Sequence, residues 1–290
     1  MLVALLRSLR PAQWVKNAFV LAPLVFAHRL EDPRLLAAAA LAFFAFCAAS
    51  SAVYLVNDLA DRDEDRLHPV KRLRPIAAGA LPVAVAWPAA AALAAAAALA
   101  ASRLDGRFAL YLAAYFALNL LYTFSFKHIV ILDVMSISAG FVLRVLAGAA
   151  AIGVEVSSWL LLCTTFVALF LAFSKRRHEL MLLADSAASQ RRVLEQYSPT
   201  FLDQMINVTT ASTVICYALY AVAPETAAKL GTRHLIATLP LVLYGIFRFL
   251  YLLYQRPGRR NPTEAILADV PFLANLALWS VLVVALVYGG

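Results

Sequence analysis

Charged residues are scarce in this chain. Asp, Glu, Lys and Arg make up 14% of the 290 residues, whereas 63% are hydrophobic and the mean hydropathy is +0.78. So apolar a composition excludes an ordinary soluble domain. The hydrophobic residues come in long blocks, which are typical of a helical protein that crosses a membrane several times. Residues 1–10 include Arg7 and Arg10 and contain no small-residue cleavage site, so we expect no cleaved signal peptide.

Cysteine is also rare, with three residues in the chain. Cys47, Cys163 and Cys216 each lie inside a hydrophobic block, and they show neither metal-ligand spacing nor a disulfide framework. We therefore interpret them as small core residues.

The hydrophobic blocks predict an all-α, polytopic membrane protein with a single domain over residues 1–290. They mark about nine candidate spanning helices, which are 16–28, 35–57, 82–102, 107–126, 129–153, 157–174, 205–223, 235–254 and 271–288. The first is short and is interrupted by Pro23. The third is rich in alanine, which predicts close packing against other helices. The same alanines permit self-association without requiring it, so an oligomer stays open.

Lys and Arg are concentrated in the loops after the second, fourth, sixth and eighth predicted helices. This bias places those loops and the N-terminus in the cytoplasm. Anionic lipid and a phosphorylated substrate are enough to explain the net charge of +8, with no need for nucleic acid. We therefore expect the helices to surround a cavity that opens to the cytoplasmic side, with the active site there.

The most informative segment follows the second predicted helix and spans residues 57–65, NDLADRDED. On a helix, Asp58, Asp61 and Asp65 fall on one stripe, with Asn57 close by. Three carboxylates on one stripe repel each other unless a cation lies between them. Hard oxygen ligands favour Mg²⁺, which bridges to substrate phosphates. The sequence thus predicts a catalytic magnesium site at the membrane surface. The alternative is a solvated loop that caps a membrane helix.

Candidate substrate ligands lie at the first predicted helix, around the acidic stripe, and in the loops after the fourth and sixth helices. They are Lys16, Asn17, Asn57, Arg72, Arg74, Tyr122, Lys127, Lys175, Arg176 and Arg177. The alternative interpretation of these Lys and Arg residues is that they only supply the positive charge that keeps a loop on the cytoplasmic side. Arg144 lies inside a predicted span, where an arginine either faces a cavity or belongs to a structural pair. The sequence leaves both roles of Arg144 open.

These motifs resemble those of the UbiA-type prenyltransferase superfamily. The spacing NDxxDxxxD at 57–65 is similar to its first acidic motif, and the basic run KRxxP at 71–75 follows with Gly79. Two features depart from the superfamily pattern. The place of its second aspartate pair holds SKRRHE at 174–179, and the spacing from Tyr122 to Lys127 is one residue longer than expected.

One branch of the superfamily fits these departures. The segments RPxQWxKN at 10–17, HPxKRxRPIAAG at 68–79 and KRRHEL at 175–180 are similar to those of decaprenyl-phosphate phosphoribosyltransferases. The resemblance implies a bacterial plasma-membrane enzyme that transfers 5-phosphoribose from 5-phosphoribosyl-1-diphosphate to a polyprenyl (decaprenyl) phosphate and releases pyrophosphate. It also implies a role in making the lipid-linked arabinose precursor of the cell wall.

The chemistry of that reaction agrees with the residues. A donor with one diphosphate needs one acidic Mg²⁺ site, and a lipid phosphate is already an anion that needs no strong general base. We expect Lys16 and Lys127 to bind the lipid phosphate and Arg72 to bind the donor.

Two other functions stay open. A UbiA-type enzyme that prenylates an aromatic acceptor would consume prenyl diphosphate, and the missing second aspartate pair argues against it. A lipid or solute transporter without enzyme activity would carry charges along its spanning helices. Here the charges gather at one face, with Arg144 and Arg248 as exceptions.

Overall fold

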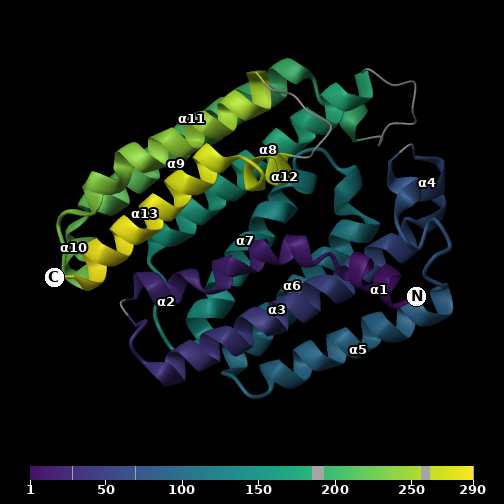
Figure 1. The fold of residues 1–290 in the computed structure, drawn as a ribbon, viewed down its shortest axis with the longest axis horizontal. Helices are drawn as coiled ribbons and strands as arrows, with labels where there is room; N and C mark the ends of the chain where they lie inside the picture. Colours follow the sequence, from purple (N-terminus) through teal and green to yellow (C-terminus); the bar gives the residue numbers. More distant parts are fainter. Residues whose placement is uncertain (28, 69, 185–192, 256–261, 290) are drawn as a thin grey trace. The chain divides into compact units, whose positions relative to one another are not determined.

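The computed structural model of the protein describes residues 1–27, 29–68, 70–184, 193–255 and 262–289. Within these ranges every regular element is a helix, and eight helices are long and apolar enough to cross a membrane (Figure 1). The chain divides into two compact units, Met1–Val156 and Ser157–Gly290. The predicted all-α membrane fold is confirmed, whereas the single domain stays a prediction.

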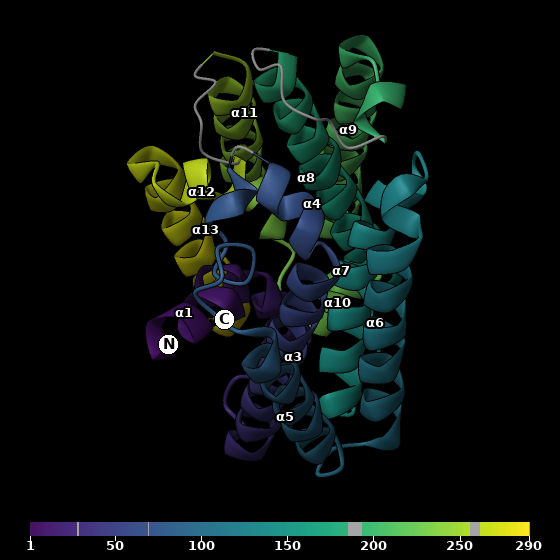
Figure 2. The same cartoon turned by 90° about the vertical axis from the view of Figure 1, so that its right-hand side faces the viewer.

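The first unit combines long α-helices with short 3₁₀-helices, which are labelled η. Its elements are α1 (Leu2–Leu9), η1 (Pro11–Val20), α2 (Ala22–Phe26), α3 (Pro33–Ala60), α4 (Arg62–Leu67), η2 (Lys71–Leu73), α5 (Val83–Ala101), α6 (Gly106–Phe124), η3 (Phe126–His128) and α7 (Leu132–Ala151). Helix α3 packs against α1, η1, α5, α6 and α7. Short helix α4 follows at one end of α3 (Figure 2).

The first predicted span, residues 16–28, is wrong as a continuous α-helix. This part of the chain is the 3₁₀-helix η1 followed by the short helix α2, which has Pro23 in its first turn. Proline has no backbone N–H, so it fits the first turn of a helix and breaks a longer one. The predicted count of about nine spanning helices therefore becomes eight in the part of the chain that the structure describes.

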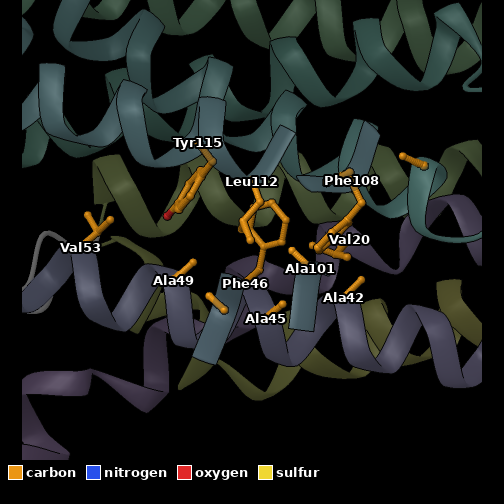
Figure 3. Packing of buried hydrophobic residues seen from close by; sticks show 13 residues of the cluster. Val20, Ala42, Ala45, Phe46, Ala49, Val53, Ala101, Phe108, Leu112 and Tyr115 are labelled. Atoms are coloured by element: carbon orange, nitrogen blue, oxygen red, sulfur yellow. The ribbon is translucent and has the colours of Figure 1, made fainter. Parts of the chain in front are cut away.

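The core of the first unit forms around Phe46 and the small residues near it on α3. The ring of Phe46 lies 6.0 Å from that of Phe108 and 5.2 Å from that of Tyr115, both on α6. Alanines of α3, α5 and α7 fill the space around these rings (Figure 3). Because alanine lets helix backbones approach closely, the alanine-rich helix α5 packs along α3, as its composition predicted.

Helix α7 and η1 approach each other closely at Gly148. A Cβ atom built at this position would overlap the carbonyl oxygen of Val20, the last residue of η1. Val20 itself is almost fully buried in the core of the unit. The missing side chain of Gly148 thus allows the backbone of η1 to lie directly on α7.

The second unit consists of α8 (Ser158–Ala184), η4 (Leu194–Gln196), α9 (Pro199–Val222), α10 (Pro224–Leu230), η5 (Leu235–Thr238), α11 (Leu239–Gln255), α12 (Pro262–Leu267) and α13 (Val270–Tyr288). Helices α8 and α9 pack along each other, and α11 packs on α13. Asp269 caps α13 by accepting from the backbone N–H of Phe272, and it also binds Arg248 of α11 at 2.8 and 3.0 Å. Arg248, which the sequence places within a spanning helix, is therefore paired with the residue that caps α13.

Two glycines of α7 give a matched test of the contact between η1 and α7. We expect Gly148→Ala to destabilise the protein by about 1–3 kcal/mol, because the new methyl group forces the backbones apart. At Gly140 the new Cβ would lie 3.5 Å from the nearest atom, an ordinary contact. Gly140→Ala should therefore be neutral or stabilising, by up to about 1 kcal/mol. Thermal unfolding in one detergent compares the two, and equal stability of both variants would contradict the close contact.

Candidate functional site

The acidic segment lies at the junction of α3 and α4. Asp61 lies between the last residue of α3 and the first of α4, and its φ of −87° and ψ of 2° interrupt the helix for this single residue. The backbone N–H of Asp61 still bonds to Asn57, and that of Asp65 to Asp61, so the spacing of four residues is kept across the break. The new helix also places Asp65 in its first turn, where the helix dipole favours negative charge.

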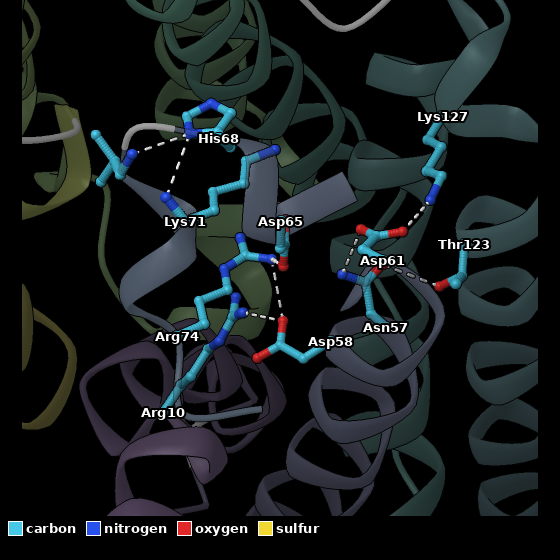
Figure 4. A network of polar contacts seen from close by, with 11 residues as sticks. Arg10, Asn57, Asp58, Asp61, Asp65, His68, Lys71, Arg74, Thr123 and Lys127 are labelled. Carbon is cyan, nitrogen blue, oxygen red and sulfur yellow. Dashed lines mark hydrogen bonds and ion pairs between the residues drawn. The ribbon is translucent and has the colours of Figure 1, made fainter. Parts of the chain in front are cut away.

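The predicted carboxylates are buried together with cations from distant parts of the chain. Asp58, Asp61 and Asp65 are only 2%, 5% and 2% exposed. A carboxylate removed from water is costly unless it is paired and hydrogen-bonded. The ion pairs at the junction meet this requirement in two separate groups (Figure 4).

The first group is centred on Arg74, which lies just after η2. Its Nη1 atom is 3.1 Å from Asp58 Oδ1 and 2.6 Å from Asp65 Oδ2. The Nη2 atom of Arg10 lies 2.5 Å from the same oxygen of Asp58. The guanidinium of Arg10 also lies over the ring of Tyr54, 4.9 Å from its centroid. The guanidinium of Arg74 thus lies between Asp58 and Asp65, two of the three predicted metal ligands.

The second group contains Asp61 and the residues of α6 and η3. Lys127 Nζ lies 2.5 Å from Asp61 Oδ1, and Asn57 Nδ2 donates to Asp61 Oδ2 at 3.2 Å. Thr123 donates its hydroxyl hydrogen to Asn57 Oδ1 at 3.3 Å. The structure therefore places both Lys127 and Asn57 against Asp61, and their predicted binding of substrate stays a prediction. Tyr122, next to Thr123 on α6, is half-buried.

The remaining candidates of the first unit differ in exposure. Arg72 is exposed on η2, beside the turn in which His68 Nδ1 accepts from the backbone N–H groups of Val70 and Lys71. Lys16 is half-buried on η1, whereas Asn17 is fully buried and bonds to protein groups. In this conformation the Asn17 side chain has no surface for a ligand, and its predicted role in phosphate binding stays a prediction.

The basic candidates of α8 belong to the second unit and are engaged in ion pairs there. Arg176 is fully buried and donates to Glu179 at 2.6 Å. Arg177 binds Asp203 of α9 at 2.5 Å, and its guanidinium stacks on Tyr254 at 4.1 Å from the ring centroid. Lys175 is the most exposed of the three cations.

The donor set of the junction fits a hard divalent cation in part. Carboxylate oxygens are the ligands that Mg²⁺ prefers, and Asp58 and Asp65 already share one positive group. Asp61 belongs to the other group, however, and within the described ranges no three His, Cys, Asp or Glu residues converge on one point. The structure thus joins two of the three predicted metal ligands, and the set of three stays a prediction.

Two residues of the site were absent from the predicted ligands. Arg10 belongs to the segment at 10–17 that resembles one branch of the superfamily, and it binds Asp58, which lies 48 positions away. Thr123 binds Asn57 across 66 positions. Neither pairing has a local sequence signal. Arg10 also adopts the left-handed φ of 53° immediately before Pro11, a conformation that no residue-type preference predicts.

Comparisons with known proteins agree with this architecture. The family model described as "UbiA prenyltransferase family" matches residues 18–281. A Corynebacterium glutamicum protein named decaprenyl-phosphate phosphoribosyltransferase is 38% identical over 289 residues, which cover 98% of this chain and 86% of that protein. A protein of the same name from Mycolicibacterium smegmatis is 37% identical, over 79% of this chain and 73% of its own length.

A solved structure supports the fold. It is described as a UbiA homolog from Archaeoglobus fulgidus bound to GPP and Mg²⁺, and it matches with a TM-score of 0.73 and 21% identity. The match covers 99% of this chain and 98% of that one. The likeness shows that the two chains share a fold.

Burial gives Asp65 a testable pH dependence. Desolvation raises the pKa of its carboxyl group above the usual value, and the attraction of Arg74 only partly offsets this effect. The folded protein therefore binds the proton more tightly than the unfolded chain, so the ionised group costs stability at neutral pH. This cost disappears as the pH falls through the raised folded pKa to the unfolded value.

We therefore expect Asp65→Asn to unfold at a higher temperature than the wild type at pH 7. The difference should shrink towards pH 4, because the wild-type carboxyl becomes protonated. Thermal unfolding of both proteins from pH 7.5 to 4 measures it. A difference that grows on acidification would show that the ionised group is stabilised by its partners.

Proposed function

The chain belongs to the UbiA prenyltransferase family, and from this membership we propose that it is a polyprenyl-phosphate phosphoribosyltransferase of the bacterial plasma membrane. It would transfer the 5-phosphoribosyl group from 5-phosphoribosyl-1-diphosphate to a polyprenyl (decaprenyl) phosphate and release pyrophosphate on the cytoplasmic side. The observation that carries this proposal is the similarity to the Corynebacterium relative over nearly the whole chain. The product would be the lipid-linked pentose used for cell-wall arabinan.

The chemistry at the end of α3 supports the proposal. A donor with one diphosphate needs one acidic site, and three buried carboxylates, those of Asp58, Asp61 and Asp65, lie at the junction of α3 and α4. These three residues would hold Mg²⁺, which neutralises the leaving diphosphate. Arg74, between two of the carboxylates, and the exposed Arg72 nearby would bind diphosphate oxygens.

The reaction forms one bond and breaks one. An oxygen of the lipid phosphate attacks C1 of the ribose, and the bond from C1 to the diphosphate oxygen breaks with its electron pair on pyrophosphate. Positive charge develops on the ribose ring, as in glycosidic cleavage. The attacking phosphate is already an anion, so no proton has to be removed. The site therefore has to position its substrates and balance their charges.

Lys16 and Lys127 are our candidates for the lipid phosphate. Both lie in the first unit, and Lys127 pairs with Asp61 beside the proposed metal ligands. When Lys127 binds the lipid phosphate, it would exchange one anionic partner for another at the point where the acceptor must enter. Lys175, Arg176, Arg177, Asn57 and Tyr122 remain candidates for further contacts to the substrates, including the ribose 5-phosphate.

A transfer assay tests the function directly. Purified protein, Mg²⁺, decaprenyl phosphate and donor labelled in its ribose should give a labelled product that partitions into organic solvent. Chelation with EDTA should stop the reaction, and excess Mg²⁺ should restore it.

Two results would contradict the proposal in different ways. If the label stays in the aqueous phase while prenyl diphosphate is consumed with an aromatic acceptor, the protein is a prenyltransferase. If neither reaction occurs but lipid moves across the bilayer of a reconstituted vesicle, the protein is a transporter.

The acidic segment also contains its own control. Asp58→Asn and Asp61→Asn should each lower turnover by about 100-fold or more, because each removes a charge that would hold the metal. Asp63→Asn should leave turnover within about twofold, since Asp63 is 77% exposed and pairs only with neighbouring arginines in the described structure. Turnover is compared at equal amounts of folded protein. Full activity of both Asn variants at 58 and 61 would refute the assignment.

A further inference from the structure

The 3₁₀-helix η1 is unusually long. Runs of this type beyond three or four residues are uncommon, because their hydrogen-bond geometry is poorer than that of an α-helix. Yet η1 extends over ten residues, Pro11–Val20, and packs against both α3 and α7. Such a segment needs contacts from its neighbours to keep its shape, and those contacts include buried polar groups of α3 and α7.

Arg144 of α7 is the largest of these polar groups. It is 5% exposed and donates three hydrogen bonds: Nε to Asn17 Oδ1 at 2.8 Å, Nη1 to the carbonyl of Gly140 at 2.8 Å, and Nη2 to the hydroxyl of Tyr115 at 2.9 Å. Its guanidinium also lies 4.7 Å from the centroid of the Tyr115 ring. A charged side chain at this depth is expensive, so it is expected to have a specific role.

Asn17 connects this arginine to α3. Its carboxamide oxygen accepts from Arg144, and its Nδ2 atom lies 3.2 Å from Ser50 Oγ and 3.4 Å from Cys47 Sγ. The same η1 segment rests on Gly148 of α7 through its backbone. Asn17 is thus the residue through which η1 is bonded to both neighbouring helices.

The other end of η1 reaches the candidate site. Arg10 precedes η1 and contacts Asp58 at 2.5 Å. From Asn17 to Arg10 is seven residues, roughly 14 Å at the rise of a 3₁₀-helix. Between them, Trp14 Nε1 donates to Ser51 Oγ at 3.1 Å, and that hydroxyl donates to the carbonyl of Leu9 at 3.0 Å. The segment is therefore bonded to α3 at several points along its length.

We propose that Arg144 is a positioning residue for the candidate site. Through Asn17 it fixes η1, and η1 in turn holds Arg10 against Asp58. The inference rests on the proposed function in one respect only, which is that the site receives a diphosphate. It also assigns Asn17 a role different from direct phosphate binding, because the buried carboxamide acts on the site through the backbone of η1.

A double-mutant cycle measured by binding tests this role. The probe is Mg²⁺ pyrophosphate, titrated calorimetrically into the full-length protein in nanodiscs. Asn17→Ala and Arg144→Gln should each weaken binding about tenfold, the loss expected for one charge-assisted hydrogen bond. The double variant should also be about tenfold weaker instead of hundredfold, since both changes release the same segment.

Two further variants separate positioning from other roles. Tyr115→Phe removes a hydrogen bond to Arg144 but leaves Asn17 bonded, so it should lower the unfolding temperature slightly and leave the affinity unchanged. Asn17→Asp keeps the acceptor for Arg144 and loses only the donor to Ser50 Oγ, so it should weaken binding less than Asn17→Ala does. If Asn17 touched the diphosphate directly, the new negative charge would weaken binding strongly.

The proposal is overturned if the single variants bind as tightly as the wild type, if their effects multiply in the double variant, or if Tyr115→Phe weakens binding equally. Should Arg144→Gln prove too unstable to purify, Arg144→Lys takes its place in the cycle, because it keeps the charge but cannot make all three hydrogen bonds. A wild type that binds pyrophosphate but makes no ribosylated lipid would refute the proposed function alone. A wild type that binds neither pyrophosphate nor the donor would refute both.

Discussion

The first unit depends on the neutralisation of buried carboxylates at the end of one helix. Asp58, Asp61 and Asp65 are nearly inaccessible to water, and burying an unpaired carboxylate costs several kcal/mol even after relaxation. Their partners Arg10, Arg74 and Lys127 come from three different parts of the chain, before η1, after η2 and within η3. Each of these connecting segments therefore has to end near the same point. The negative charge that the proposed function requires also organises the loops around it.

The same unit shows how a polar site is supported by an apolar bundle. Helix α3 carries Phe46 and a series of small residues in its membrane-spanning part, and Asn57 and Asp58 in its last turn. Small residues let α5 and α7 pack closely, which fixes the direction of α3 and hence the direction of its carboxylates. Within this packing the polar link from Asn17 to Arg144 is fully enclosed. Hydrogen bonds in such surroundings are specific, because any misplaced donor or acceptor would be left unsatisfied.

Sequence patterns predicted what depends on local physics and missed what depends on tertiary contacts. Spans such as Val83–Ala101 follow from hydropathy alone, and the acidic stripe follows from helical spacing. The predicted α-helix over residues 16–28 is wrong because hydropathy does not distinguish an α-helix from a 3₁₀-helix that is held by buried polar groups. The pairing of Arg176 with Glu179 is readable from their spacing of three residues, whereas that of Arg177 with Asp203 is not. Ion pairs between segments far apart in sequence leave no periodic signal.

The chemical character of the site favours an acceptor that is already ionised. The groups that meet at the junction of α3 and α4 are carboxylates, cations, one amide and one hydroxyl. The neighbouring imidazole of His68 uses its Nδ1 atom to hold the turn before η2. An aromatic or alcohol acceptor would have to lose a proton, and each of the three buried carboxylates is already paired with a cation. A phosphate monoester needs no such base. Such an acceptor needs only that its negative charge be neutralised while it approaches the donor, and the cations paired with the carboxylates here are suited to that role.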